Sequence, residues 1–170
     1  MDTELEQLAG RVQRLEDLEA IRATWLDYCN RLDSGDFVAL GDVFMEHADV
    51  EMQGLAAGLD GVYRGRSSII ADFYRRTASA GPATKAGLMT GHLSTNMQIA
   101  LDGDEATTLA YFFEIVDDNL VLIGTYQHRM RREPDRWRFA RLRISVRFRA
   151  RIDARDLHGR SLRDIIATPI

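Results

Sequence analysis

The residue best suited to acid–base chemistry in this sequence is His92, in the stretch Gly91-His92-Leu93-Ser94. An imidazole titrates near neutral pH, so it can take a proton from carbon or oxygen without a large change in its pKa. The structural alternative is a polar residue that opens a strand and is hydrated by solvent. Two other histidines, His47 and His158, are expected at the surface.

Tyr28 and Asp33 are the other candidates for a catalytic role, and each has an ordinary structural reading. Tyr28 lies on an apolar helical stripe, where most tyrosines are core residues whose hydroxyl reaches one partner. A catalytic Tyr28 would hydrogen-bond a substrate carbonyl or a departing oxygen. Asp33 opens the run Asp-Ser-Gly-Asp, which is typical of a turn and a helix cap. Trp25, one turn before Tyr28, is expected to form a pocket wall.

A second group of candidates for substrate binding lies in the later strands. Tyr111, Glu114 and His128 are each predicted to lie in the middle of a strand. A buried carboxylate is costly unless it is paired, so Glu114 is either a functional acid or an outward residue in a misread register. From the last strand Arg143, or Arg141 in its place, is expected to reach the site.

Several kinds of chemistry lack their motifs. The sequence contains no glycine-rich phosphate loop, no Gly-x-Ser-x-Gly and no His-x-x-x-His. Cys29 is the only cysteine, which excludes an intramolecular disulfide and a cysteine-based metal cluster. We therefore expect neither phosphoryl transfer, serine hydrolysis nor metal hydrolysis.

The elements that must position these residues follow from periodicity. Apolar residues recur every three or four positions from Leu5 to Leu32, which predicts one long helix, and two short helices are expected near residues 37–44 and 67–78. Alternation predicts strands at residues 48–53, 93–101, 106–116, 120–132 and 137–148. The apolar parity of the last strand changes near Ala140, which predicts a β-bulge there. This order of elements indicates an α+β fold.

Bulk properties narrow the class further. The 170 residues are predicted to form a single domain, with its core at about 12–148 and a tail at about 149–170. Residues 129–163 hold thirteen arginines and four acids, so this segment carries +9 and the remainder −13. Because these arginines alternate with apolar residues, we interpret them as a solvated strand face rather than a nucleic-acid surface. No apolar run is long enough for a membrane helix, and we expect a cytoplasmic protein without a membrane partner.

The chain resembles the SnoaL-like group of the nuclear-transport-factor-2-like superfamily. The resemblance covers about residues 12–148 and is carried by short motifs in a fixed order. These are Leu15-Glu16-Asp17-Leu18-Glu19-Ala20-Ile21-Arg22, Tyr28-Cys29-Asn30-Arg31-Leu32-Asp33-Ser34-Gly35-Asp36, Leu40-Gly41-Asp42-Val43-Phe44, Tyr63-Arg64-Gly65-Arg66, Gly91-His92-Leu93-Ser94-Thr95-Asn96, Gly124-Thr125-Tyr126 and Trp137-Arg138-Phe139. The resemblance implies a cone-shaped α+β barrel, in which a long N-terminal helix and two short helices pack on a strongly bent mixed sheet.

The nearest branch contains scytalone dehydratase, bile-acid 7α-dehydratase and hexachlorocyclohexane dehydrochlorinase, which need no cofactor. Tyr28, Asp33 and His92 match the tyrosine, aspartate and histidine of that branch. The resemblance therefore implies that His92 abstracts a proton, that Asp33 orients His92, and that Tyr28 polarises a carbonyl or leaving group.

We accordingly expect a lyase or isomerase of the dehydratase type, acting on a small apolar cyclic molecule in an internal pocket. Its substrate would be a steroid, terpenoid, polyketide or aromatic catabolite. The first alternative is a non-catalytic ligand-binding module or a small structural subunit of a ring-hydroxylating dioxygenase-like complex. A weaker alternative is an epoxide hydrolase of the same fold. Self-association as a homodimer or homotrimer is also expected.

Overall fold

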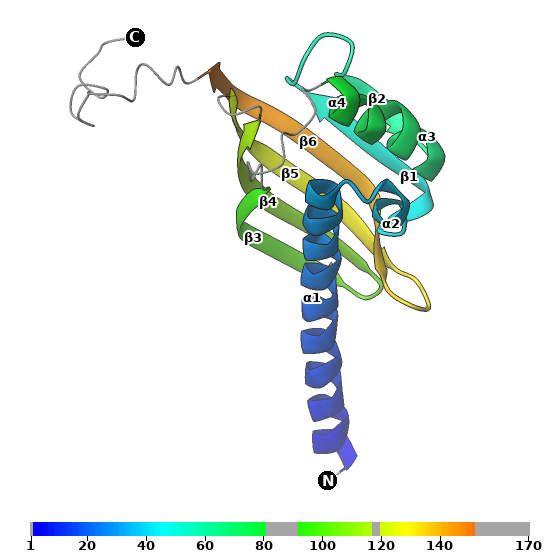
Figure 1. Cartoon of the computed structure of the whole chain (residues 1–170). Coiled ribbons are helices and arrows are strands. Elements are labelled where there is room, and N and C mark those ends of the chain that lie inside the picture. Colours follow the sequence, from blue (N-terminus) through cyan, green and yellow to red (C-terminus); the bar gives the residue numbers. More distant parts are fainter. Residues whose placement is uncertain (1, 81–91, 117–119, 152–170) are drawn as a thin grey trace, which may run out of the picture.

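The computed structural model describes residues 2–80, 92–116 and 120–151 of the chain (Figure 1). Helix α1, Asp2–Ser34, is the long helix that the apolar periodicity predicts. It ends at Gly35, whose positive φ of 71° allows the amide groups of Gly35 and Asp36 to bond back to carbonyls of the last helical turn. The predicted turn at residues 117–119, His158 and the tail beyond residue 151 lie outside the described residues.

Helix α2, Phe37–Gly41, begins at a cap that leaves Asp33 free for another role. The carboxylate of Asp36 accepts a hydrogen bond of 3.0 Å from the amide of Ala39, which satisfies a donor in the first turn. The capping reading of Asp33 is therefore wrong. Strand β1, Phe44–Gln53, starts four residues earlier than its alternation predicts.

The segment after β1 is less regular than the single predicted helix. Strand β2, Gly61–Arg64, pairs with β1 and was not expected from the sequence. It is followed by α3, Arg66–Ser68, a π-helical segment η1, Ile69–Tyr74, and α4, Arg75–Ala80. The wider π-helical turn buries the consecutive residues Phe73 and Tyr74, which a regular amphipathic helix would place on diverging faces.

The remaining strands complete a six-stranded sheet in the order β2-β1-β6-β5-β4-β3. Their bounds are Leu93–Asp102 for β3, Glu105–Val116 for β4, Leu120–Arg132 for β5 and Trp137–Arg151 for β6. Strand β1 is parallel to β6, and all other neighbours are antiparallel. Ala140 is the extra residue between the pairs Arg129↔Arg141 and Met130↔Phe139, so the predicted bulge is confirmed.

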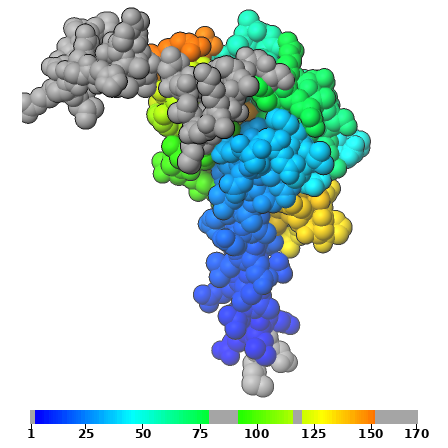
Figure 2. All heavy atoms as spheres, viewed as in Figure 1, coloured from blue at the N-terminus to red at the C-terminus, as the bar shows by residue number. Residues whose placement is uncertain are grey.

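The sheet is bent, and the second half of α1 packs against its inner face (Figure 1). There Ile21, Trp25 and Tyr28 join Phe139 and Leu142 in one buried core. The α+β class and the mixed, bent sheet are therefore confirmed. The first half of α1 projects beyond the body of the molecule (Figure 2). None of the described helices is long and apolar enough to span a membrane.

Candidate active site

Three ionisable side chains from distant parts of the chain meet at one end of the inner face. Asp33 lies in the last turn of α1, His92 directly precedes β3, and Glu114 lies on β4. Nδ1 of the His92 ring is hydrogen-bonded to Oδ1 of Asp33. Its Nε2 lies 3.5 Å from Oε1 of Glu114. The imidazole is thus held between two carboxylates.

The local structure explains why these side chains converge. The backbone amide of His92 donates to Oδ2 of Asp33 at 3.2 Å, so Asp33 holds both the ring and the main chain of the residue before β3. Leu93 pairs with Phe113 in the antiparallel ladder, which places the preceding His92 beside Glu114. Glu114 continues the inward parity of Ala110 and Phe112, both of which are buried.

The site is partly open to solvent. The exposed fractions of the side chains are 11% for His92, 19% for Glu114 and 30% for Asp33. A fully enclosed charged cluster would carry a large desolvation penalty, which the remaining exposure of these side chains reduces. The exposure is therefore compatible with acid–base chemistry on a bound molecule.

The surroundings shift both the imidazole and one carboxyl group. Burial opposes the charged form of His92, but the hydrogen bond to Asp33 and the charges of Glu114 and Asp33 outweigh it and raise the pKa of His92. Burial also raises the pKa of Glu114, against the lowering effect of the nearby His92, and the charge of Asp33 adds to the rise. The surroundings thus favour the protonated forms of both His92 and Glu114.

This arrangement assigns a different task to each ring nitrogen. When Nδ1 carries a proton and donates it to Asp33, the lone pair of Nε2 is free to accept a proton. Asp33 then stabilises the imidazolium that forms, as the carboxylate of a His–Asp dyad does. A protonated Glu114 next to the same nitrogen is a hydrogen-bond and proton donor. One acceptor and one donor thus lie within reach of a single substrate.

Below this cluster lies a group of buried phenols. The hydroxyl of Tyr74 donates to that of Tyr28 at 3.1 Å, and the ring of Tyr28 lies 6.4 Å from that of His92 between centroids. Tyr126 packs against Tyr28 at 6.2 Å. Burial raises the pKa of all three hydroxyls, so they stay neutral. Neutral phenols can donate to a carbonyl or to a departing oxygen.

His128 and Trp25 lie deeper on the inner face, with ring centroids 4.6 Å apart. Nδ1 of His128 is hydrogen-bonded to the hydroxyl of Thr108, whereas its Nε2 has no partner among the described residues. Burial lowers the pKa of His128 to about 3, so the ring is neutral. His128 lies on the same face of the sheet as His92. Because its ring is neutral, it cannot act as a cation there.

Two of the predicted substrate-binding residues lie elsewhere. Tyr111 belongs to the opposite parity of β4 and is 45% exposed on the outer face of the sheet. Arg143 also points outward, and its Nε binds Oε2 of Glu51 at 2.9 Å. Arg141 binds the same carboxylate oxygen. The expectation that these residues line the site of His92 is wrong, because the bulge at Ala140 keeps Leu142 and Ile144 on the inner face instead.

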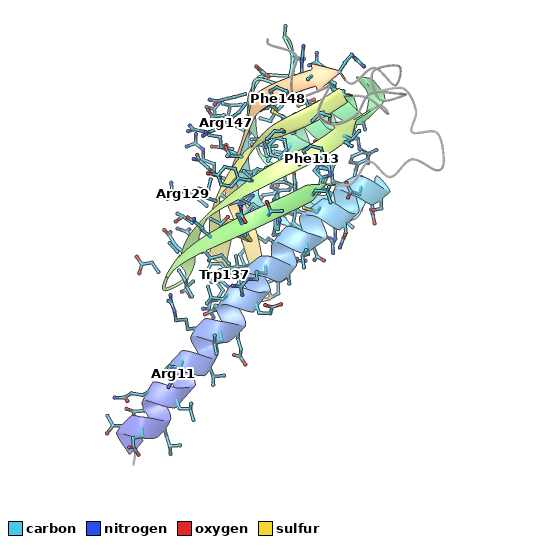
Figure 3. All side chains as sticks on the ribbon, turned by 90° about the vertical axis from the view of Figure 1, so that its left-hand side faces the viewer. Arg11, Phe113, Arg129, Trp137, Arg147 and Phe148 are labelled. Carbon is cyan, nitrogen blue, oxygen red and sulfur yellow. The ribbon has the colours of Figure 1, made fainter. Side chains whose placement is uncertain are left out.

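The outer face carries much of the arginine-rich character of the sequence. Figure 3 shows Arg129 and Arg147 on the side of the sheet away from α1. A hollow of about 730 Å³ on this face is lined by residues of β1, β3, β4, β5 and β6, among them Arg129 and Arg141. Glu51 neutralises part of this charge through its two arginine partners, which lower the pKa of its carboxyl group.

Sequence reasoning missed two members of the inner-face cluster. Tyr74 comes from the π-helical segment, whose register gives no periodic signal. Tyr126 shares strand parity with His128, so alternation along β5 could have placed it on the inner face. No group of three or more histidine, cysteine or acidic side chains within the described ranges has an arrangement that would hold a metal ion.

Comparisons with known proteins agree with this fold. The model of a family described as the SnoaL-like domain matches residues 13–143. No curated protein sequence matches the chain. A solved NTF2-like protein with a cystatin-like fold from Novosphingobium aromaticivorans is 26% identical and has a TM-score of 0.65, with 92% of this chain and 97% of that chain covered.

Two further solved structures bear enzyme names. A candidate scytalone dehydratase from Novosphingobium aromaticivorans is 20% identical, with a TM-score of 0.64 and coverage of 87% of this chain and 97% of its own. Hexachlorocyclohexane dehydrochlorinase LinA-type3 from Novosphingobium barchaimii is 15% identical, with a TM-score of 0.66 and coverage of 89% and 95%. At these identities the likeness establishes the fold.

Proposed function

The chain belongs to the SnoaL-like domain family, and from that premise we propose that it is a lyase or isomerase whose active site is formed by Asp33, His92 and Glu114. The reaction is a proton abstraction from a small apolar cyclic substrate, and it needs no cofactor. The observation that carries this proposal is the imidazole held between two carboxylates, one on each ring nitrogen.

The side chains of the site can supply every proton transfer that the proposed reaction needs. Nε2 of His92 takes a proton from a carbon of the substrate, and the electron pair of that C–H bond forms a double bond. In a dehydration the hydroxyl on the neighbouring carbon leaves with a proton from Glu114, as water. In an isomerisation no group leaves, and the proton returns to a different carbon. General-base catalysis of this kind contributes about 10²–10⁴ in rate.

The phenols complete the proposed site. Tyr28 is fully buried and neutral, and Tyr74 donates to its oxygen. In the proposed reaction the proton of Tyr28 turns to a carbonyl or departing oxygen of the bound substrate. Trp25 and His128 would form the inner wall against which an apolar ring packs. Nε2 of His128 would then form a hydrogen bond with one polar atom of the substrate and so orient it on this aromatic surface.

The named structural neighbours support the reaction class. One is named for the dehydration of scytalone and the other for the removal of hydrogen chloride from hexachlorocyclohexane. Each name describes an elimination, and in the second case the substrate is an apolar ring with halide leaving groups. We propose that the present protein acts on a molecule of this general kind. In the dehydrochlorination the departing chloride would need no proton from Glu114.

Turnover by a His92→Gln variant tests the proposal. Scytalone and hexachlorocyclohexane serve as first probes, followed by a panel of hydroxylated and halogenated cyclic compounds. We expect turnover of any accepted compound to fall at least about 100-fold while the far-UV circular dichroism stays unchanged. His47→Gln, at an exposed position of β1, is the matched control and should keep full activity.

Near-normal turnover by His92→Gln would overturn the mechanism. If the wild-type protein binds members of the panel without converting any of them, the ligand-binding alternative replaces the enzyme. Copurification with a larger iron-containing chain would instead favour the subunit alternative.

A further inference from the structure

The projecting half of α1 exposes four large apolar side chains. The exposed fractions are 61% for Leu5, 54% for Leu8, 45% for Val12 and 66% for Leu15. Isolated apolar residues are common on protein surfaces, but a continuous apolar stripe marks an interaction site. All four belong to a stretch of helix that extends away from the body in Figure 2, with Arg11 marking the same stretch in Figure 3.

The spacing of these residues is that of a coiled coil. Steps of three, four and three residues place Leu5 and Val12 at the a positions of two heptads, and Leu8 and Leu15 at the d positions. The second heptad, with Val12 at a and Leu15 at d, has the combination that favours two-stranded parallel coiled coils. A single surface helix packing on its own domain would instead show a broader apolar face.

The stripe faces away from the body of the protein. The residues by which α1 contacts the sheet, Asp17, Ile21 and Tyr28, are buried on one side of the helix. At about 3.6 residues per turn, the centre of the apolar stripe lies roughly on the opposite side of the same helix. A partner helix on the stripe would therefore lie clear of the sheet, and the two bodies would be on the outer sides of the helix pair.

The charged residues beside the apolar stripe indicate that the partner is a second copy of this chain. Arg11 occupies a g position and Glu16 the following e position, and neither forms an ion pair with another described residue. In a parallel pair of identical helices, the g residue of one chain lies next to the e residue of the next heptad on the other chain. Arg11 then meets the partner's Glu16, and the symmetry of the dimer repeats the contact.

We propose that residues 4–16 of α1 form a parallel two-stranded coiled coil with a second copy of this protein. An isolated peptide of this length would not be helical in water, because nucleating a helix is costly. Here the second half of α1 is already fixed on the sheet, so the first half continues a helix that is formed. Glu19 and Arg22, which form an ion pair at 3.5 Å, end the apolar stripe toward the body.

A cysteine placed in the stripe tests both the contact and its direction. In a parallel pair a d residue lies beside its own copy, so Leu8→Cys should form an intermolecular disulfide on mild oxidation of the full-length protein. Gln13→Cys, exposed at a b position on the same helix, is the matched control and should crosslink at least about tenfold more slowly. The buried Cys29 is common to both variants. Equal crosslinking rates would overturn the proposal.

A charge exchange in the Leu8→Cys background tests the choice of partner. Arg11→Glu and Glu16→Arg should each slow crosslinking, on the order of tenfold, because each replaces two attractive contacts by two repulsive ones. The double variant R11E/E16R restores the opposite charges and should recover most of the rate. Failure of this rescue, or an unchanged rate for Glu16→Arg alone, would contradict a parallel homodimer.

Discussion

The two neighbouring carboxylates of Asp33 and Asp36 take different roles. Asp36, three residues later, caps α2 through the amide of Ala39. Asp33 is consequently available to His92, which it contacts through both the ring and the main chain. Asp36 thus supplies the N-cap of α2, and the carboxylate of Asp33 serves the site.

At this scale we predict that Asp33→Asn lowers the pKa of His92. The loss of the carboxylate removes both the hydrogen bond and a charge that raise that pKa, while burial, which lowers it, remains. The histidine resonances followed by NMR over a pH titration measure the shift directly. Asp36→Asn keeps a good capping residue and should leave the pKa of His92 unchanged; an equal shift in both variants would contradict the assignment.

The contact between Asp33 and His92 also leads us to predict how the stability of the protein depends on pH. Because the pKa of His92 is raised in the folded state, its favourable contribution is fully present below the usual histidine pKa of about 6.5. The contribution is lost as the pH rises through the higher folded value. Asp33→Asn should therefore destabilise the protein more at pH 6 than at pH 9, as measured by urea unfolding. A larger effect at pH 9 would exclude a charged His92 as the group stabilised by Asp33.

At the scale of elements, a buried carboxylate fastens α1 to the hairpin of β5 and β6. Asp17 accepts a hydrogen bond of 3.2 Å from the indole of Trp137 and binds the guanidinium of Arg132. Arg132 in turn lies over the ring of Trp137, 5.3 Å from its centroid. Two turns further along the helix, the hydroxyl of Thr24 donates to the carbonyl oxygen of Trp137 at 2.9 Å. These contacts fix the position at which α1 enters the body.

Asp17→Ala should therefore lower the free energy of unfolding by about 2–3 kcal/mol, because it leaves the buried indole of Trp137 without its acceptor, whereas the partly exposed Arg132 keeps its ion pair with Asp104. Asp27, on the same helix, also pairs with arginine but its side chain is 42% exposed. Its alanine variant should cost about 1 kcal/mol or less. Urea unfolding of both variants measures the difference. Comparable losses would show that Asp17 does not anchor the helix.

At the scale of the whole molecule, the outer face of the sheet carries a row of exposed apolar side chains. Leu93, Phe113, Ile123 and Phe148 are neighbours across β3, β4, β5 and β6 in the ladder. Their exposed fractions range from 38% to 60%. A contiguous apolar patch of this kind is typical of a surface covered by another protein.

We expect this row to form a second contact between copies of the chain, distinct from the helix pair of α1. Phe113→Glu places a charge in the middle of the row and should lower the molar mass measured by light scattering at micromolar concentration. Thr107→Glu, a polar position on the same face of β4, serves as the control and should keep the wild-type mass. A monomeric mass for the wild-type protein would refute self-association as a whole.

Local patterns in the sequence were sufficient for the elements and for the types of group at the site. The periodicity of α1, the alternation along the later strands and the bulge at Ala140 depend on neighbouring residues alone, so they can be predicted from the chain. The same holds for His92 and Asp33 as candidates, because their chemistry belongs to their side chains. Strand β2 is only four residues long and gives no periodic signal.

The tertiary structure alone decided which of these groups meet. Glu114 faces His92 because of the register between β3 and β4, whereas Tyr111 and Arg143 point to the opposite face of the same sheet. A shift of one residue in a strand reverses the direction of every side chain, and that choice is made by packing against α1 rather than by the strand itself. The pKa values of His92 and Glu114 depend in the same way on burial and on partners that are distant in the chain.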